Sequence, residues 1–397
     1  MINKTTILFF VLASILFSQS MQYAFAAADS RNTSPTLAAP LDLVDTGEPG
    51  AIIGNGDVIL GINKGGQLNV DYRAVPALGL PPADPAGVGS VGLRDGTGAL
   101  ASTEPGCECE GWGLASLFSG LSGFLNDSVG SSDNIHLVSF TGVDGGTTAV
   151  SVVEIHDGAD VPTFRVTHDF HPSAGSSKLY EVEVTVKNIS PVLQQDLAYR
   201  RVMDWDVFPT PFDEFVTIFG TATTSQLIAS GNNGFLTADP TTVTPFSCGQ
   251  ADGYECTPGT RDVDFTDVGP DDIGSVFDFD LGDFAPDEEK TFKIFYGNAP
   301  TEVSAISALT AVNAELYSLG QSNTVDGPTL GTPVTFMFAF GDVGGKPLGV
   351  VGGEKLSIDN SALLIAGLSA NAVWILPMLA GLAGAGIYLT RSKTNWI

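Results

Sequence analysis

Two aspartates that flank a tryptophan, Asp204-Trp205-Asp206, are the residues whose types and spacing are best suited to catalysis. Glycosidases use two carboxyl groups, about 5 Å or about 6.5–9.5 Å apart, on either side of a sugar. Because alternate residues of a strand share a face, Asp204 and Asp206 are expected to lie close together. The motif indicates a carbohydrate site in which Trp205 contacts the sugar. The nearby acids Asp213 and Glu214 fit the same interpretation. The favoured interpretation, however, is that the two aspartates form strand-end ion pairs with Arg200 and Arg201.

Acidic residues are concentrated further along the chain, where eleven of them and no basic residue lie between Asp262 and Glu289. Clustered carboxylates on loops supply the oxygen ligands that Ca²⁺ requires. The spacing of Asp262, Asp264 and Asp267 approaches that of a calcium loop, although it departs from the EF-hand pattern. Two interpretations stay open: a calcium site at these three residues, or a solvated acidic face that keeps the protein soluble. No other cofactor is expected.

The chain contains four cysteines, Cys107, Cys109, Cys248 and Cys256. An even number of cysteines in an exported chain indicates disulfide bonds. A bond between Cys107 and Cys109 would close a small, strained ring, so bonds from this pair to the later two are favoured, and their connectivity stays open. A four-thiolate metal site and free thiols are the alternatives, although the spacing is not a standard zinc pattern.

The four histidines, His136, His156, His168 and His171, do not form a recognisable metal-binding pattern. His168 and His171 are three positions apart and would face opposite sides of a strand, so one metal ion could not bind both without a bend. Structural or surface roles are expected for them. The chain also lacks the G-x-S-x-G motif of serine hydrolases and the Walker motif of nucleotide-binding proteins.

Composition and charge exclude several classes of protein. The 397 residues carry 17 basic and 45 acidic side chains, a net charge of −28. Nucleic acid as a partner is excluded because phosphates are bound mainly by lysine and arginine. The 47 glycines and 23 prolines are too many for a helical bundle, and a hydrophobic content of 43% is too high for a disordered acidic chain.

Both ends of the chain have the pattern of targeting segments. Residues 1–26 combine a lysine, an apolar run and an Ala-Phe-Ala end, which predicts a signal peptide. Residues 362–390 are uncharged and longer than the roughly 20 residues that span a bilayer, which predicts a transmembrane helix. The basic residues that follow favour a short cytoplasmic tail, residues 391–397. The body, residues 27–361, would then lie on the outer face of the cell membrane.

The body must position these residues mainly through β-strands. Residues 180–187 alternate valine with polar residues, and similar patterns occur over 57–63, 67–71, 148–155, 163–170, 197–207, 214–219, 291–296 and 332–341. Residues 301–319 instead space their apolar side chains three or four apart and predict one amphipathic helix. Residues 74–106 are rich in proline and glycine and predict a long surface excursion. The prediction is a large antiparallel β-sandwich with one docked helix, in one domain or two subdomains.

Several segments resemble known families. Residues 53–68, 180–190, 199–206 and 277–296 are similar to strand pairs of the β-supersandwich domains that precede glucoamylase-type catalytic barrels. The resemblance implies a supersandwich-like fold, but hydrolase activity does not follow, because the helical barrel has no counterpart here. The body also resembles uncharacterised secreted bacterial and archaeal surface proteins with a YRRVMDWD-like strand, a GCxCEGWG-like turn and a C-terminal tail like those removed by sorting enzymes. That family implies no established activity.

These observations favour a non-enzymatic cell-surface protein, exported and anchored by one C-terminal span, with a structural or adhesive role. Its expected ligands are surface glycans or calcium, and its expected contact with the membrane is the C-terminal span. The alternative is an extracellular carbohydrate-active enzyme with its active site at Asp204 and Asp206.

Overall fold

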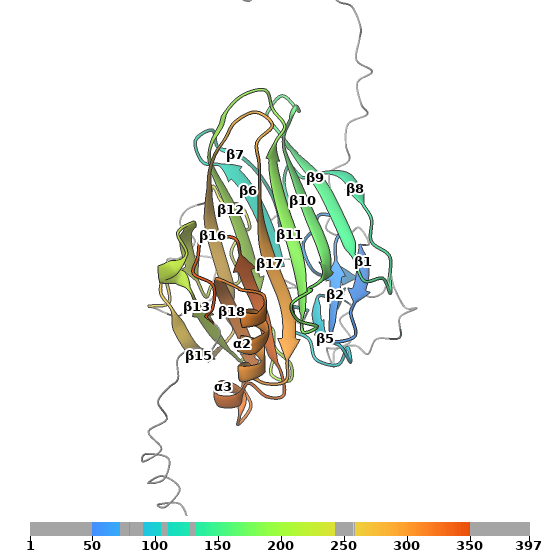
Figure 1. Ribbon diagram of the computed structural model, residues 1–397, viewed down its shortest axis with the longest axis vertical. Coiled ribbons are helices and arrows are strands. Elements are labelled where there is room, and N and C mark those ends of the chain that lie inside the picture. The colour runs from blue at the N-terminus through green and yellow to red at the C-terminus, as the bar shows by residue number, and fades with distance from the viewer. Residues whose placement is uncertain are drawn as a thin grey trace, which may run out of the picture. The chain divides into compact units, whose positions relative to one another are not determined.

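The computed structural model describes residues 50–71, 79, 90–104, 110–126, 132–242, 257 and 259–349. Most of the regular structure in these residues is β-strand, and every pairing between named strands is antiparallel. Two large sheets hold most of the strands (Figure 1). The expectation of an all-β, antiparallel body is confirmed.

The larger sheet has nine strands. In spatial order these are β15 (Phe265–Asp271), β13 (Glu214–Phe219), β18 (Leu316–Ser322), β19 (Thr335–Gly341), β17 (Glu289–Ala299), β11 (Leu179–Asn188), β10 (Pro162–Pro172), β9 (Ala149–His156) and β8 (His136–Phe140). The second sheet has five strands, in the order β14 (Leu227–Gly231), β16 (Gly274–Phe284), β12 (Gln194–Asp204), β6 (Glu110–Ser116) and β7 (Leu121–Asn126).

Two small sheets form at the N-terminal end of the described chain. One contains β1 (Ala51–Gly54), β2 (Val58–Ile62) and β5 (Leu93–Asp95), and the other pairs β3 (Val70–Asp71) with β4 (Ser90–Val91). The excursion predicted for residues 74–106 therefore holds short strands. Arg94 in β5 is buried and donates to Glu104 Oε1 at 2.5 Å and to the Ser90 carbonyl at 2.8 Å. Residues 90–94 and 101–104 are buried, and only the turn between them reaches the surface.

Strand β11 shows why the sequence forms this sheet. Val182, Val184 and Val186 are fully buried, as their alternation predicts. On the opposite face of the strand, Thr185 and Thr291 form a cross-strand hydroxyl pair at 2.9 Å. β11 therefore presents an apolar face to the core and a polar face outward.

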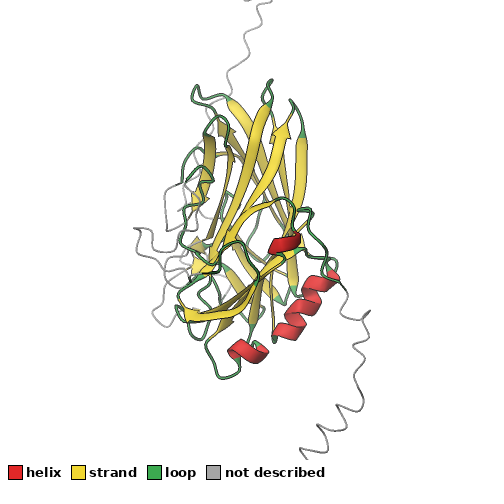
Figure 2. Ribbon diagram, turned by 90° about the vertical axis from the view of Figure 1, so that its left-hand side faces the viewer, coloured by secondary structure: helices red, strands yellow, loops and turns green. Residues whose placement is uncertain are grey.

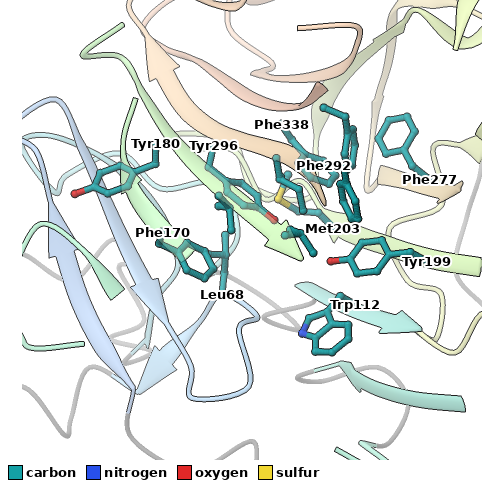
Figure 3. Close-up of a cluster of buried hydrophobic side chains, with 14 of the residues drawn as sticks. Leu68, Trp112, Phe170, Tyr180, Tyr199, Met203, Phe277, Phe292, Tyr296 and Phe338 are labelled. Carbon is teal, nitrogen blue, oxygen red and sulfur yellow. The ribbon is translucent and has the colours of Figure 1, made fainter. Parts of the chain in front are cut away.

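The core lies between the two large sheets, which appear as facing layers in Figure 2. Aromatic rings from both sheets meet there (Figure 3): Tyr199 of β12 packs edge-on against Phe292 of β17 with ring centroids 4.9 Å apart. Phe277 of β16 contacts Phe338 of β19 at 5.7 Å in the same way. Edge-to-face pairs of this kind add to the hydrophobic stabilisation from burial.

A charged pair is buried inside this apolar core. Arg201 of β12 and Glu110 of β6 are both 0% exposed, and Arg201 Nε donates to Glu110 Oε1 at 2.5 Å. Glu110 also accepts from the Tyr296 hydroxyl at 3.0 Å and from the Leu68 backbone N–H at 2.7 Å. The pair links both large sheets and the N-terminal segment through one carboxylate.

The outer face of each large sheet is partly covered. Helix α2 (Glu302–Ala311) packs Ala305, Ala308 and Leu309 on the outer face of the nine-stranded sheet, beside β17 and β19 (Figure 1). Residues 232–242 cover the five-stranded sheet, where Arg200 donates to the carbonyls of Thr237 and Asp239. The described residues also contain two short helices, η3 (Thr221–Thr223) and α3 (Gly327–Leu330).

The predicted helix is half as long as its sequence pattern indicates. It begins where expected, with Thr301 as N-cap, but ends at Ala311, and residues 316–322 form strand β18. Asn313 adopts a left-handed conformation, φ 56°, at this transition. β18 is buried on both faces: Leu316 joins the core between the sheets and Leu319 the cluster under α2. Leu316 and Leu319 are three positions apart and lie on opposite faces of the strand. Because both faces are buried, their spacing in the sequence is the same as that of an amphipathic helix.

Removing the cap of α2 is expected to cost about 1 kcal/mol of unfolding free energy. The Thr301 hydroxyl accepts from the Ser304 N–H at 3.2 Å, and the Ser304 hydroxyl accepts from the Thr301 N–H at 3.2 Å. Urea denaturation of Thr301→Ala would measure the loss. Val303→Ala is the matched control in the same helix, because Val303 is 81% exposed, and it should change stability by less than about 0.5 kcal/mol. Equal effects of the two changes would contradict the capping role.

Within the described residues, no helix has the length and apolar character needed to cross a bilayer. The predicted signal peptide (residues 1–26), transmembrane helix (362–390) and tail (391–397) lie outside the described residues, as do Cys107, Cys109, Cys248 and Cys256.

Candidate metal centre at the sheet crossovers

Two of the connections that carry the chain from one large sheet to the other, β12 to β13 and β15 to β16, have acidic residues at or beside their ends. Asp204 is the last residue of β12 in the five-stranded sheet, and Glu214 is the first residue of β13 in the nine-stranded sheet. Asp272 lies between the end of β15 and the start of β16, where the chain returns. Asp206 lies in the first crossover, two residues after Asp204. The four carboxyl groups therefore belong to the junction between the sheets.

Glycines let the chain segments approach closely at this junction. A Cβ on Gly234 would lie 2.7 Å from the Cα of Asp204, and one on Gly274 would lie 2.1 Å from the carbonyl oxygen of Met203. Real side chains do not tolerate such distances, so only glycine fits at either position. The first crossover is also held by the Asp206 N–H, which donates to the Ser102 carbonyl at 2.8 Å.

The carboxylates form a compact cluster. Oxygen atoms of Asp204, Asp206 and Asp272 all lie within 4.8 Å of one another. Asp204, Asp206 and Glu214 are at most 1% exposed, and Asp272 is half-buried and brings the cluster to the surface. Glu214 is oriented by two backbone donors, the N–H of Ile273 on Oε1 and the N–H of Asp213 on Oε2, each at 3.1 Å.

Burial and mutual repulsion shift the acidity of the cluster. Burial raises the pKa of Asp204 well above its usual value, and the charge of Asp272 raises it further. Burial likewise raises the pKa of Asp206, with added repulsion from Asp204, Glu214 and Asp272. For Glu214, burial and then Asp204 raise the pKa to about 10, although its two backbone donors oppose the shift. Bringing these groups together as free anions is therefore strongly unfavourable.

Asp206 is the member of the cluster whose carboxylate lacks hydrogen-bond partners in the described part of the chain. Both of its carboxylate oxygens are buried, and neither has a hydrogen-bond partner within the described residues. A buried carboxylate without a partner costs several kcal/mol unless a proton or a cation neutralises it. Since its oxygens face those of Asp204 and Asp272, a single small cation could satisfy all three groups.

The predicted ion pairs of Asp204 and Asp206 with Arg200 and Arg201 are wrong. Arg200 makes a two-pronged contact with Asp278, at 2.7 Å from Nε and 2.8 Å from a terminal nitrogen, and Arg201 pairs with Glu110. Adjacent residues of a strand point to opposite faces, so the two arginines separate: Arg201 enters the core, and Arg200 lies under the outer covering segment.

Trp205 lies between the two aspartates in sequence, but its side chain points elsewhere. The indole is 0% exposed, and its Nε1 donates to the Ser318 hydroxyl at 3.0 Å. A Cβ on Gly320 would lie 2.5 Å from the ring, so the backbone of β18 packs directly against the indole. In this structure the indole presents no face to a sugar.

The structure does not bring the predicted calcium loop together. Asp264 Oδ1 accepts from the Thr221 N–H at 2.8 Å, Asp262 Oδ1 from the Ser230 N–H at 2.9 Å, and Asp267 Oδ1 from the Thr217 hydroxyl at 3.4 Å. Within the described residues these carboxylates belong to no cluster with metal-binding separations. Each fixes a different turn or strand.

Histidine placement agrees in part with the sequence analysis. His168 is fully buried beside Trp112, with its Nε2 3.1 Å from the Tyr199 hydroxyl, and His171 is half-buried on the same strand. Burial, with the nearby Arg201 charge, lowers the pKa of His168 well below its usual value, so it is a neutral core residue. His136 and His156, which showed no sequence pattern, stack on each other with ring centroids 3.8 Å apart.

Sequence reasoning selected Asp204 and Asp206 and missed Asp272. The available indication was the pair Asp271-Asp272, which directly precedes the apolar-rich run 273–279 and therefore marks the start of a strand. Glu214 was recognised as an acid near the Asp204-Trp205-Asp206 motif and as the beginning of a strand, but not as a neighbour of Asp272. The separation of about 60 residues between Glu214 and Asp272 kept these groups apart in any local pattern.

Comparisons with known proteins do not assign this chain to a family. No protein-family model matches the sequence, and no curated protein matches it. Among solved structures, the chain is similar to a galactose mutarotase related enzyme from Lactobacillus acidophilus, with 9% identity, over 73% of this chain and 84% of that one, at a TM-score of 0.29.

The cluster has the chemistry of a site for a hard cation. Its donors within the described residues are carboxylate oxygens, which suit Ca²⁺ and Mg²⁺ better than softer metals. Ligands on opposite sides of Ca²⁺ are about 5 Å apart, given Ca–O distances of about 2.3–2.6 Å. The separations of at most 4.8 Å between the oxygens of Asp204, Asp206 and Asp272 fit that sphere.

Proposed function

We propose that this protein is an exported, membrane-anchored cell-surface protein with a structural or adhesive role, and that calcium at Asp204, Asp206 and Asp272, beside Glu214, holds its two large sheets together. The observation that carries the calcium proposal is the buried carboxylate of Asp206, which has no hydrogen-bond partner within the described residues and faces two further carboxylates. Export and anchoring are supported by the apolar segments at residues 1–26 and 362–390.

The choice of a cation over shared protons follows from where the protein is expected to act. Outside the cell, calcium is abundant, and one divalent ion shared by several carboxylates can displace the protons that burial would otherwise hold on them. Binding of an ion to the folded form alone stabilises it by about 2.7 kcal/mol when the ion is at 100 times its dissociation constant. An ion at the junction would oppose separation of the sheets because its ligands come from both crossovers.

Calcium is expected to raise the melting temperature of the full chain, purified in mild detergent, at pH 7.5. Differential scanning calorimetry with millimolar CaCl₂ and with a chelator would measure the shift, and MgCl₂ would test selectivity. The shift should vanish in Asp206→Asn, which removes the central ligand charge and keeps the side-chain shape.

The matched control is Asp262→Asn, which changes a residue of the loop first expected to bind calcium. Because Asp262 lies outside the cluster, this variant should keep the full calcium shift. The proposed site would be refuted if wild type showed no shift, or if Asp262→Asn abolished the shift and Asp206→Asn kept it.

The surface role needs tests of its own. Mass spectrometry of the native protein should find a mature N-terminus near residue 27, and protease added to intact cells should remove the body. A glycan array probed with the calcium-loaded full chain would test the adhesive role through carbohydrate. If the protein bound no glycan on the array, the proposed adhesion through carbohydrate would be refuted and only the structural role would remain.

The alternative of a carbohydrate-active enzyme at Asp204 and Asp206 is disfavoured by burial. A reacting sugar must contact both carboxyl groups, and both are at most 1% exposed. Hydrolysis of polysaccharides by wild type, lost in both Asp204→Asn and Asp206→Asn with their folds retained, would reverse this conclusion.

A further inference from the structure

A second group of metal-binding side chains lines a cleft away from the carboxylate cluster. The cleft has a volume of about 1040 Å³ and is bounded by β7, β8, the end of β9, the start of β10 and the turn after β11. β7 and β8 are edge strands of the two large sheets (Figure 1), so the cleft opens between the sheets at their common margin. His136 and His156 lie in its wall.

The two imidazole rings are held face to face. His136 begins the edge strand β8, His156 ends β9, and their rings are 3.8 Å apart with an interplanar angle of 6°. His156 is fixed by Asn134, whose side-chain oxygen accepts from the His156 N–H at 3.2 Å and whose side-chain nitrogen donates to the His156 carbonyl at 2.7 Å. His136 is half-buried on the edge strand β8.

A carboxylate completes the group. Asp160 Oδ1 lies 2.8 Å from His156 Nδ1. Its position is set by a tight turn in which Asp157 Oδ1 accepts from the N–H groups of Ala159 and Val161, at 2.8 and 3.0 Å. Asp160 adopts φ 62° there and its side chain is 68% exposed. Ligand atoms of His136, His156 and Asp160 all lie within 4.8 Å of one another.

The other side of the His156 ring points to a second carboxylate. His156 Nε2 is buried without a hydrogen-bond partner within the described residues, and Glu154 Oε2 is 3.7 Å away. Glu154 is itself anchored by Arg165, which donates to Oε1 at 2.6 and 3.0 Å. Metal-binding histidines commonly direct their second nitrogen at a carboxylate, which fixes the tautomer and strengthens the ligand.

We propose that His136, His156 and Asp160 bind a divalent transition metal ion, zinc or copper(II), in this cleft. The ion takes the place of the proton between His156 Nδ1 and Asp160 Oδ1, and the His156 proton moves to Nε2, facing Glu154. His136 supplies the third ligand after its ring turns out of the stack, because two parallel rings cannot both hold one ion in plane. Two imidazoles and a carboxylate suit zinc and copper(II) better than calcium. The open cleft leaves the remaining coordination positions to water or a small ligand.

Calorimetric titration of the full chain with ZnCl₂ tests the proposal, after alkylation of free thiols so that cysteines do not compete. Wild type should bind one zinc ion that millimolar calcium does not displace. His136→Gln and Asp160→Asn should each weaken binding by about tenfold or more, and their melting temperatures without metal should stay near that of wild type. His171→Gln, a half-buried histidine of β10 outside the cleft, is the matched control and should bind as wild type does.

Copper(II) gives an independent spectroscopic readout of the ligands. The electron paramagnetic resonance spectrum of the wild-type complex should show nitrogen couplings from two imidazoles, and that of His136→Gln couplings from one. Absence of zinc binding by wild type, or unchanged affinity in both His136→Gln and Asp160→Asn, would overturn the proposal. Asp206→Asn should keep zinc binding, so failure of the calcium site and failure of this one are distinguishable.

Discussion

Replacing Glu110 by alanine is expected to destabilise the fold by about 3–5 kcal/mol, because it leaves a buried guanidinium without its counter-charge. Arg201 is 0% exposed, and Glu110 is its carboxylate partner in the core. Burial by itself lowers the pKa of Arg201, but the charge of Glu110, with Tyr296 and Tyr199, outweighs this and keeps the pKa above its usual value. Without Glu110 that support is lost, but a guanidinium is basic enough to keep its proton in proteins. Arg201 therefore stays charged, and the cost falls on the folded state.

Denaturation in urea, followed by circular dichroism, would measure this loss. The double variant Glu110→Leu/Arg201→Met should recover much of it, since replacing a buried ion pair by apolar side chains is often close to neutral. Glu289→Ala serves as the control, because it breaks an exposed pair with Lys187 and should cost less than about 1 kcal/mol. A cost for Glu110→Ala no larger than that of Glu289→Ala would contradict the structural importance of the buried pair.

In the absence of calcium, the carboxylate cluster should make the protein less stable as pH rises from 5 to 8. An acid whose pKa is raised by folding keeps its proton in the folded state and loses it in the unfolded state above about pH 4, so increasing pH favours unfolding. Each carboxyl group that stays protonated in the folded state lowers the free energy of unfolding by about 1.4 kcal/mol for each unit by which the pH rises. For Glu214 this window runs from the ordinary value of 4.5 to about 10.

The contribution of the cluster to the pH dependence of stability can be separated from that of the other titrating groups. The comparison is between wild type, Asp206→Asn and Glu214→Gln, each measured in the presence of chelator. Each variant should be less sensitive to pH than wild type between pH 5 and 8, and it should be relatively more stable at pH 8. Calcium should flatten the slope of wild type, because it replaces the protons, and its stabilising effect should grow with pH. Identical pH profiles for wild type and both variants would show that the cluster does not hold protons in the fold.

Nine of the nineteen described strands could be predicted from the sequence, because half-buried strands carry a local alternation. Residues 180–187 and 214–219 agree closely with β11 and β13. The pattern failed where a strand is buried on both faces: Leu316 and Leu319 serve two separate cores, so their spacing matched a helix. It also failed over residues 90–104, where Arg94 enters the interior with Glu104 as its partner.

The candidate sites were predicted less completely because their partners are distant in sequence. The aspartates at 204 and 206 could be selected from their spacing, but Asp272 reaches them only through the pairing of β12 with β16. Arg201 and Glu110 are 91 residues apart, so local reasoning paired the arginine with its nearest acids instead. The cleft histidines are 20 residues apart and meet only because β8 pairs with β9.

Strand β15 has a consequence for how molecules of this protein behave when they are crowded together. It is one outer edge of the nine-stranded sheet, and an exposed edge is a template for pairing with a strand of another molecule. Asp267 and Asp271 place negative charge along β15, Pro270 removes a backbone donor, and the register with β13 is irregular. A neighbouring copy would meet repulsion and an incomplete hydrogen-bonding ladder at this edge, so a dense layer of these molecules is protected there against edge-to-edge aggregation.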